Sequence, residues 1–265
     1  MTGVQTCALP IYRVFVAIRI DGEKSPLPEE LRASLMKKGV PVVEITLAAP
    51  EQIGGQFVLW AAATAAAGWL MGINPFDEPN VTESKLNTEK ILDSYRESGQ
   101  FADLTPSASY NHLSLITHGG RRRYKPSEIA DLQPLLKKFL TGLRSPEYVS
   151  ILCYLKEEPQ IEKALERMRA SIRRKFKTAT LRGYGPRYLH SIGQLYKGGP
   201  EEGRVIVFVR SDYESLEIPG RFYDFGQLIA AQAIGDARAL LGRNLPILVL
   251  AVKGNATKGI KEFAD

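Results

Sequence analysis

Short β-branched, apolar runs alternate with helix-length amphipathic segments along this chain of 265 residues. Residues 12–20 and 40–47 have the composition of strands, and residues 28–38 and 51–71 have the length and spacing of helices. Parallel strands need a crossover connection, and the usual connection is a helix. The sequence therefore predicts an α/β protein in which parallel sheets are flanked by helices, in three α/β/α layers.

A second block of the same kind begins near Ser127. Polar, aperiodic residues precede it, and we expect residues 101–126 to be a linker or insertion. The predicted units are residues 12–100, the linker, residues 127–243 and a tail at 244–265. The expected elements of the second block are a helix at 127–143, a strand at 148–155 that buries Cys153, a helix at 160–175, strands at 178–181 and 204–210, a helix at 226–241 and a last strand at 245–252, followed by a frayed end.

Two segments near the middle of the chain have a more specific interpretation. Residues 81–98 are expected to form a helix with Asn80 as its N-cap and Glu83 in a capping box, and Gly99 ends it. Residues 57–73 are rich in alanine and fall short of the roughly 20 apolar residues of a membrane span. We expect this helix to be buried between layers, and no membrane partner.

The net charge indicates the class of partner, and the cysteine content indicates the redox compartment. A net charge of +6 favours an anionic partner, which could be a sugar phosphate, a nucleic acid or an acidic protein. Cys7 and Cys153 are too few for a disulfide framework, which fits a reducing cytoplasm. The chain has no CxxC, no HExxH and no other metal spacing, so we expect no metal site.

The first eleven residues do not lead naturally into the strand that follows. They carry neither the basic start nor the long apolar stretch of a signal peptide. They resemble translated sequencing-adapter sequence, and we expect residues 1–11 to be non-native, with the true chain continuing upstream.

Residues 183–200 hold His190 among glycines, prolines, hydroxyl groups and cations. Glycine lets backbone N–H groups approach a ligand, and histidine exchanges a proton near neutral pH. The segment also follows a predicted strand, where open α/β sheets bind ligands. These features favour an anion site with proton transfer, and the alternative is a Gly/Pro connection with an incidental histidine. The other candidate ligand-binding residues are Arg187, Ser191, Gln194 and Lys197.

Two spaced segments resemble glucose-6-phosphate isomerase, which is built from sugar-isomerase (SIS) domains. Residues 72–85, GINPFDEPNVTESK, are similar to the signature that ends in the catalytic lysine, here Lys85. Glu78 stands where the signature usually has Gln. Residues 189–194, LHSIGQ, are similar to the histidine motif. The order of the motifs, with IPGRFYDFGQL at 218–228 and AQAIGD at 231–236, is most like the C-terminal part of transaldolase/isomerase fusions, although Tyr196 replaces a frequent histidine.

The resemblance implies an SIS-type, flavodoxin-like fold and interconversion of glucose 6-phosphate and fructose 6-phosphate. It implies that His190 opens the sugar ring and that Lys85 supplies positive charge near the same oxygens. It also implies a hexose phosphate as substrate, no metal or organic cofactor, upstream SIS and transaldolase domains, and a homodimer. The base glutamate and the phosphate loop of this family belong to an earlier domain, so we expect the chain alone to be almost inactive.

Two alternatives stay open at this point. The chain could be a phosphosugar-binding module without turnover, in which Lys85 and His190 need not share a pocket. It could also bind nucleic acid through Arg121, Arg122 and Arg123 and the basic helix at 160–175. No aromatic residues are interleaved with these cations, so we expect no nucleic-acid partner.

Overall fold

The computed structural model describes residues 14–264 except 78, 123, 145 and 213–215, so the expectation for residues 1–11 lies outside the described residues. The chain divides into two compact units, residues 8–77 and residues 78–265, which we call the N-terminal and C-terminal units. The boundary at residue 78 runs through the lysine signature.

The N-terminal unit contains the two strands and two helices predicted for it. Strands β1 (Phe15–Ile20) and β2 (Val42–Leu47) pair in parallel, and α1 (Glu29–Lys37) connects them. A small core joins these elements, because the side chains on one face of the pair pack under the helix. Its buried members are Ala17, Leu27, Leu35 and Val40.

Helix α2 (Ile53–Met71) forms where the sequence predicts a helix, but it is not buried between layers. Phe57 is 71% exposed and Trp69 is 80% exposed. The physical reason is that α2 is apolar on every side, whereas a two-stranded sheet offers little surface to cover it. The segment Pro50–Met71 is long and apolar enough to cross a membrane, but core helices of soluble proteins pass the same test. It does not establish a membrane span.

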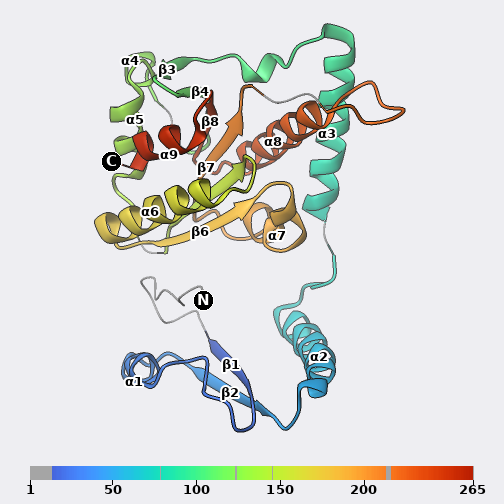
Figure 1. The fold of residues 1–265 in the computed structure, drawn as a ribbon, viewed down its shortest axis with the longest axis vertical. Helices are drawn as coiled ribbons and strands as arrows, with labels where there is room; N and C mark the ends of the chain where they lie inside the picture. The colour runs from blue at the N-terminus through green and yellow to red at the C-terminus, as the bar shows by residue number, and fades with distance from the viewer. Residues whose placement is uncertain (1–13, 78, 123, 145, 213–215, 265) are drawn as a thin grey trace. The chain divides into compact units, whose positions relative to one another are not determined.

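The C-terminal unit is built on one six-stranded sheet with strand order β3-β4-β8-β7-β5-β6 (Figure 1). The four strands β5 to β8 run parallel, and β4 pairs antiparallel with both β3 and β8. The strands are β3 (Ala108–Tyr110), β4 (Leu113–Gly119), β5 (Tyr148–Tyr154), β6 (Ala179–Tyr184), β7 (Gly203–Arg210) and β8 (Ile247–Val252).

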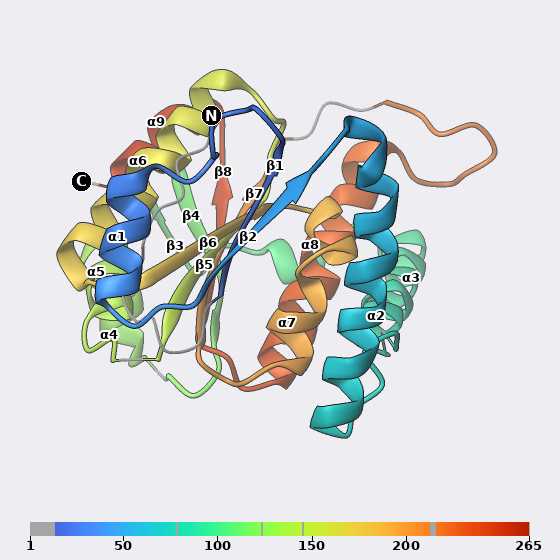
Figure 2. The ribbon, with the colours of Figure 1, turned by 90° about the horizontal axis from the view of Figure 1, so that it is seen from below.

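Helices cover both faces of this sheet, as Figure 2 shows for α6 and α9 on one side and α7 and α8 on the other. In β7, Ile206 and Phe208 pack with α5, α6 and α9, while Val205 and Val207 pack with α8. Successive side chains of a strand therefore enter two different hydrophobic cores, one on each face of the sheet. The three-layer α/β/α class is confirmed. The helices are α3 (Pro79–Ser98), α4 (Pro126–Ile129), α5 (Leu132–Leu140), α6 (Pro159–Phe176), α7 (Gly193–Gly198), α8 (Phe225–Gly242) and α9 (Ala256–Ala264), with short 3₁₀ turns η3 (Ala102–Leu104) and η4 (Arg187–His190).

Residues 101–126 are not a linker. They contain β3 and β4, and Leu113 and Leu115 of β4 are fully buried in the core. The two strands are short and their outward positions are polar, so their apolar content was too low to signal a strand. Pairing with β8 supplies the stability that local composition lacks.

The strand expected at 245–252 is present as β8, but residues 244–265 are not a tail, because they also contain α9. Strand β8 lies between β4 and β7, and α9 packs against α6. The boundary expected at residue 100 is also wrong, because α3 packs along α8 and belongs to the C-terminal unit. Sequence order alone could not show this, since β8 follows β4 in space only after more than a hundred residues of intervening chain.

Helix α3 begins at Pro79, which fits the preference for proline in the first turn. Asn80 therefore lies within the first turn instead of capping it. Glu83 does not complete a capping box, because its carboxylate pairs with Arg243 at 2.7 Å. Gly99 ends the helix with a left-handed φ of 67°, as expected.

Candidate functional site

The connections that follow β5 and β7 leave the sheet toward opposite faces. These strands are neighbours, yet β5 leads into α6 on one face and β7 leads into α8 on the other. Such a divergence opens a crevice at the carboxyl ends of the strands, where α/β sheets place their ligands. The order of the strands therefore selects one edge of the sheet as the candidate site.

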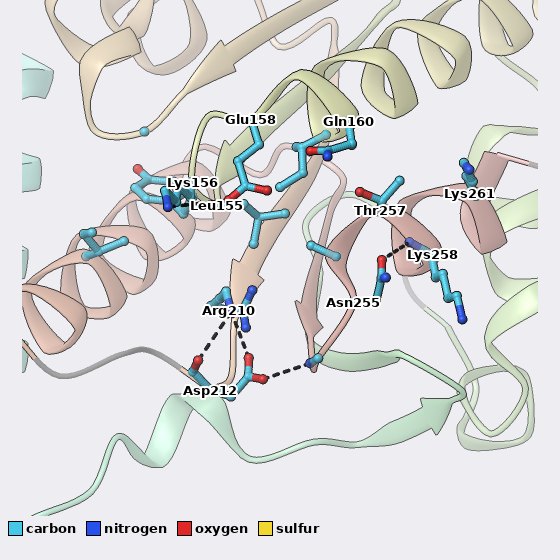
Figure 3. Close-up of a pocket in the computed structure, with 16 residues that line it drawn as sticks. Leu155, Lys156, Glu158, Gln160, Arg210, Asp212, Asn255, Thr257, Lys258 and Lys261 are labelled. Carbon is cyan, nitrogen blue, oxygen red and sulfur yellow. Dashed lines mark hydrogen bonds and ion pairs between the residues drawn. The ribbon is translucent and has the colours of Figure 1, made fainter.

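A pocket of about 750 Å³ occupies this position (Figure 3). Its walls come from the β5–α6 connection, the end of β7 and the β8–α9 connection, and it lies entirely within the C-terminal unit. Its volume is that of a site for a small metabolite. Its lining residues include the polar or charged Lys156, Glu158, Gln160, Arg210, Asp212, Asn255, Thr257, Lys258 and Lys261, with Gly254 and the apolar Leu155, Ile161 and Ile229.

Asp212 is the most constrained acid of the pocket. Arg210 donates from Nε to its carboxylate at 2.9 Å, and the backbone N–H of Gly254 donates to the other oxygen at 2.9 Å. Partial burial raises the pKa of Asp212, but the bonds from Gly254 and Arg210 outweigh it and hold the pKa below its usual value. Asp212 is therefore an anion that ties the ends of β7 and β8 together.

The starts of α6 and α9 border the same pocket. Helix α6 has Pro159 in its first turn and Glu158 at its N-cap, with no hydrogen bond from a side chain to the cap. The side chain of Asn255 accepts from the backbone N–H of Lys258 at 3.0 Å, which caps α9. The first turn of α6 thus presents backbone N–H groups that side chains leave available.

His190, the predicted proton-transfer residue, is exposed at the end of η4. Ser191 follows it and donates to the carbonyl of Tyr188 at 3.1 Å. Arg187 is exposed and pairs with Glu157 at 2.8 Å. Gln194 is half-buried in α7. The predicted loop therefore contains a 3₁₀ turn and a short helix, and it does not form one open rim of ligand-binding groups.

Lys197 is placed differently from the expectation of a ligand-binding cation. Its ammonium group lies 2.6 Å from Oδ1 of Asp236 and also contacts the hydroxyl of Ser84. The Lys197 side chain has no solvent exposure, because α7 is held against α3 and α8. The structure gives this lysine partners inside the protein, and no place at the surface.

Asp236 is the centre of a buried polar network that sequence reasoning missed. The hydroxyl of Tyr188 donates to its Oδ2 at 2.6 Å, and Tyr154 bonds to the same oxygen. Burial, together with the neighbouring carboxylate, raises the pKa of both tyrosines well above 10. The available signal was one aspartate on the apolar α8, since a buried acid requires partners.

The network links the segments that carry the two motifs. Ser84 precedes Lys85 on α3, Tyr188 precedes His190 by two residues, and both bond to the Lys197–Asp236 pair. Lys85 is exposed on α3, which packs against α7. Neither Lys85 nor His190 lines the pocket at the carboxyl ends of the strands. The C-terminal unit thus contains two separate candidate sites: the region of Lys85 and His190, and the pocket at the carboxyl ends of the strands.

The basic run at 121–123 is partly used inside the fold. Arg121 pairs with Glu147 at 2.9 Å, and Arg122 donates to the carbonyls of Lys138 and Thr141 at 3.0 and 2.8 Å. These two cations hold loops together, which weakens the nucleic-acid alternative. Among the described residues, no group of three His, Cys, Asp or Glu side chains could hold a metal ion.

No protein-family model matches the chain, and no curated protein matches it. Among solved structures it is similar to the crystal structure of a hypothetical protein, TT0462, from Thermus thermophilus, with 14% identity and a TM-score of 0.41. The match covers 93% of this chain and 54% of that one, so the chain spans about half the length of its neighbour.

Proposed function

We propose that this chain takes part in the interconversion of glucose 6-phosphate and fructose 6-phosphate, with Lys85 and His190 as the acting residues. The observation that carries the proposal is the buried network in which Ser84 and Tyr188, close neighbours of these residues, both bond to the Lys197–Asp236 pair. A rigid anchor of this kind holds two distant motifs in a constant relation.

The proposed roles follow from the chemistry of the reaction. Ring opening moves a proton from the C1 hydroxyl to the ring oxygen, and His190 exchanges that proton. A base then moves a proton between C1 and C2 through an enediol, while Lys85 stabilises the negative charge on the oxygens. The base glutamate is proposed to come from an upstream SIS domain. A cytoplasmic location, a transaldolase partner domain and a homodimer belong to the same proposal.

Binding of fructose 6-phosphate, measured by calorimetry on the 265-residue chain, tests this function. We expect Lys85→Gln and His190→Gln each to weaken binding by about tenfold or more, because each removes a contact to the substrate. Lys90→Gln is the matched control, since it removes an exposed cation from the same helix. Equal binding by all four proteins would reject the proposed roles.

Turnover is tested separately by following the isomerisation of glucose 6-phosphate. We expect the chain alone to show very little activity and to gain it when the upstream domains are present. Near-normal turnover by the chain alone would show that the base lies within these residues.

A second candidate is a module that binds a phosphosugar without converting it. The observation that favours it is the isolation of the His190 side chain, which has no hydrogen bond or ion pair with any residue in the part of the chain that the structure describes. A general base is normally oriented by a second group. Binding that is unaccompanied by turnover, even with the upstream domains present, would select this function.

A further inference from the structure

Among the described residues, the pocket at the carboxyl ends of β5, β7 and β8 is lined by more cations than acids. Four cations line it against two acids. Arg210 pairs with Asp212 at 2.9 Å, and Lys156 lies 3.6 Å from Glu158. No residue in the described ranges forms an ion pair with Lys258 or Lys261. Two positive charges therefore remain for an external anion.

The two unpaired lysines stand on one side of α9. Positions 258 and 261 are three residues apart, so their side chains emerge on the same face of the helix. Both line the pocket and both are exposed, and Figure 3 shows them on the stretch of α9 that borders it. Two lysines from one element therefore border the pocket.

Uncharged hydrogen-bond donors also border the pocket. The hydroxyl of Thr257 lines the pocket beside Lys258. Gln160 and Ile161 also line it, in the first turn of α6, where no side chain caps the N–H groups. Helices α6 and α9 pack against each other. The positive N-terminal ends of both helix dipoles therefore lie at the same pocket.

The shape of the pocket indicates what the anion is attached to. Part of the lining is apolar, because it includes Leu155, Ile161 and Ile229. A volume of about 750 Å³ exceeds the space that an inorganic ion needs and suits a small metabolite. A phosphate monoester carries a charge of about −1.5 to −2 and three acceptor oxygens, which match two ammonium groups plus hydroxyl and N–H donors.

We propose that this pocket is a binding site for a small phosphate monoester, separate from the region of Lys85 and His190. The phosphate group lies between the starts of α6 and α9, and it is held by Lys258, Lys261 and Thr257. The carbon skeleton lies against the apolar part of the lining. Asp212 keeps Arg210 oriented and fixes the β8–α9 connection through Gly254.

Calorimetric titration of the full chain tests this site with inorganic phosphate, fructose 6-phosphate and uncharged fructose as probes. To isolate the pocket, the protein carries Lys85→Gln and His190→Gln throughout. We expect saturable binding of both phosphates and none of fructose. A further Lys258→Gln/Lys261→Gln change should weaken phosphate binding by about tenfold or more.

Two matched variants make the result specific. Lys163→Gln/Lys175→Gln removes the same charge from exposed positions of α6 outside the pocket, and it should change affinity by less than about twofold because exposed charges are screened. Glu158→Gln should tighten phosphate binding, since it removes a like charge. All variants lie at accessible positions, and circular dichroism checks that they fold.

The outcomes separate this proposal from the isomerase function. Loss of phosphate binding in Lys258→Gln/Lys261→Gln alone supports the pocket. Equal loss in the α6 control means that net charge alone attracts phosphate, and it overturns the proposal. Binding of acetate as tightly as phosphate would also overturn it. Failure of Lys85→Gln and His190→Gln to affect fructose 6-phosphate binding contradicts only the isomerase roles.

Discussion

The ammonium nitrogen of Lys197 lies 2.6 Å from Oδ1 of Asp236, and the two side chains are only 0% and 2% exposed. Removing one member of such a pair leaves the other charge buried without compensation. The pair joins α7 to α8, and Ser84 extends it to α3. This small network is the structural link between the two motif segments.

Asp236→Asn is expected to lower the free energy of unfolding by about 3–5 kcal/mol, because it leaves the Lys197 ammonium buried and unpaired. Lys197→Met/Asp236→Leu should be less destabilising than the sum of its single changes, since no buried charge is left, and its remaining cost comes from the Tyr154 and Tyr188 hydroxyls that lose their acceptor. Urea unfolding measures both. The exposed Glu157→Gln, which breaks the pair with Arg187, is the control and should cost less than about 1 kcal/mol. Strict additivity in the double variant would contradict the prediction.

Stability is expected to fall in acid through Glu147. Burial raises the pKa of Glu147, but bonds from Arg204, Arg144 and Arg121 lower it from 4.5 to about 2. The folded state therefore binds the proton less readily than the unfolded state. Its contribution, about 3 kcal/mol at most, is fully present above pH 4.5 and is lost as the pH falls toward 2.

Glu147→Gln provides the comparison for this pH dependence. The variant should be less stable at pH 7, because Arg204 is buried and loses its anionic partner. Its unfolding free energy should fall less steeply than that of the original protein between pH 5 and about 3. Urea unfolding at a series of pH values measures the difference, and parallel pH profiles would show that Glu147 does not contribute.

Cys153 is expected to be unreactive in the folded protein. It is fully buried in β5, and burial raises the pKa of its thiol to about 12. The thiolate, which is the nucleophile, is therefore scarce and inaccessible. In a Cys7→Ser protein, a thiol reagent such as DTNB should label nothing until denaturant is added. Rapid labelling under native conditions would mean that the core around β5 opens readily.

Gly120→Ala is expected to destabilise the C-terminal unit by more than about 2 kcal/mol. Gly120 has a φ of 84°, and a Cβ there would overlap the carbonyl of Leu245, at the entry to β8. Gly242→Ala is the control, because no atom lies within 4 Å of its added Cβ and its φ is not positive. Thermal unfolding compares the two, and equal melting temperatures would contradict the structure at this turn.

Much of the secondary structure could be predicted because it depends on local patterns. The strand at 148–155 is apolar except for Ser150, and the helix at 160–175 is amphipathic, so each has one stable local form. The segment at 113–119 has only the short alternation Leu113–Ser114–Leu115, and pairing with β8 stabilises it as β4. The candidate functional residues also differ in whether a local pattern predicts them. Motifs predict His190 and Lys85, whereas the role of Asp236 follows only from its partners in the tertiary structure.

The sequence by itself determined the α/β class, most helices and central strands, and the candidate motif residues, because periodicity and motif spacing are local properties. Only the tertiary structure decided the strand order, the internal role of Lys197 and the pocket between α6 and α9. These depend on which distant segments meet. The pocket exists because β5 and β7 are neighbouring strands whose connections leave the sheet toward opposite faces. Helix α9, which follows β8, places Lys258 and Lys261 at the same pocket. No local sequence pattern predicts that these segments come together, since their contact results from the packing of whole layers of helices and strands.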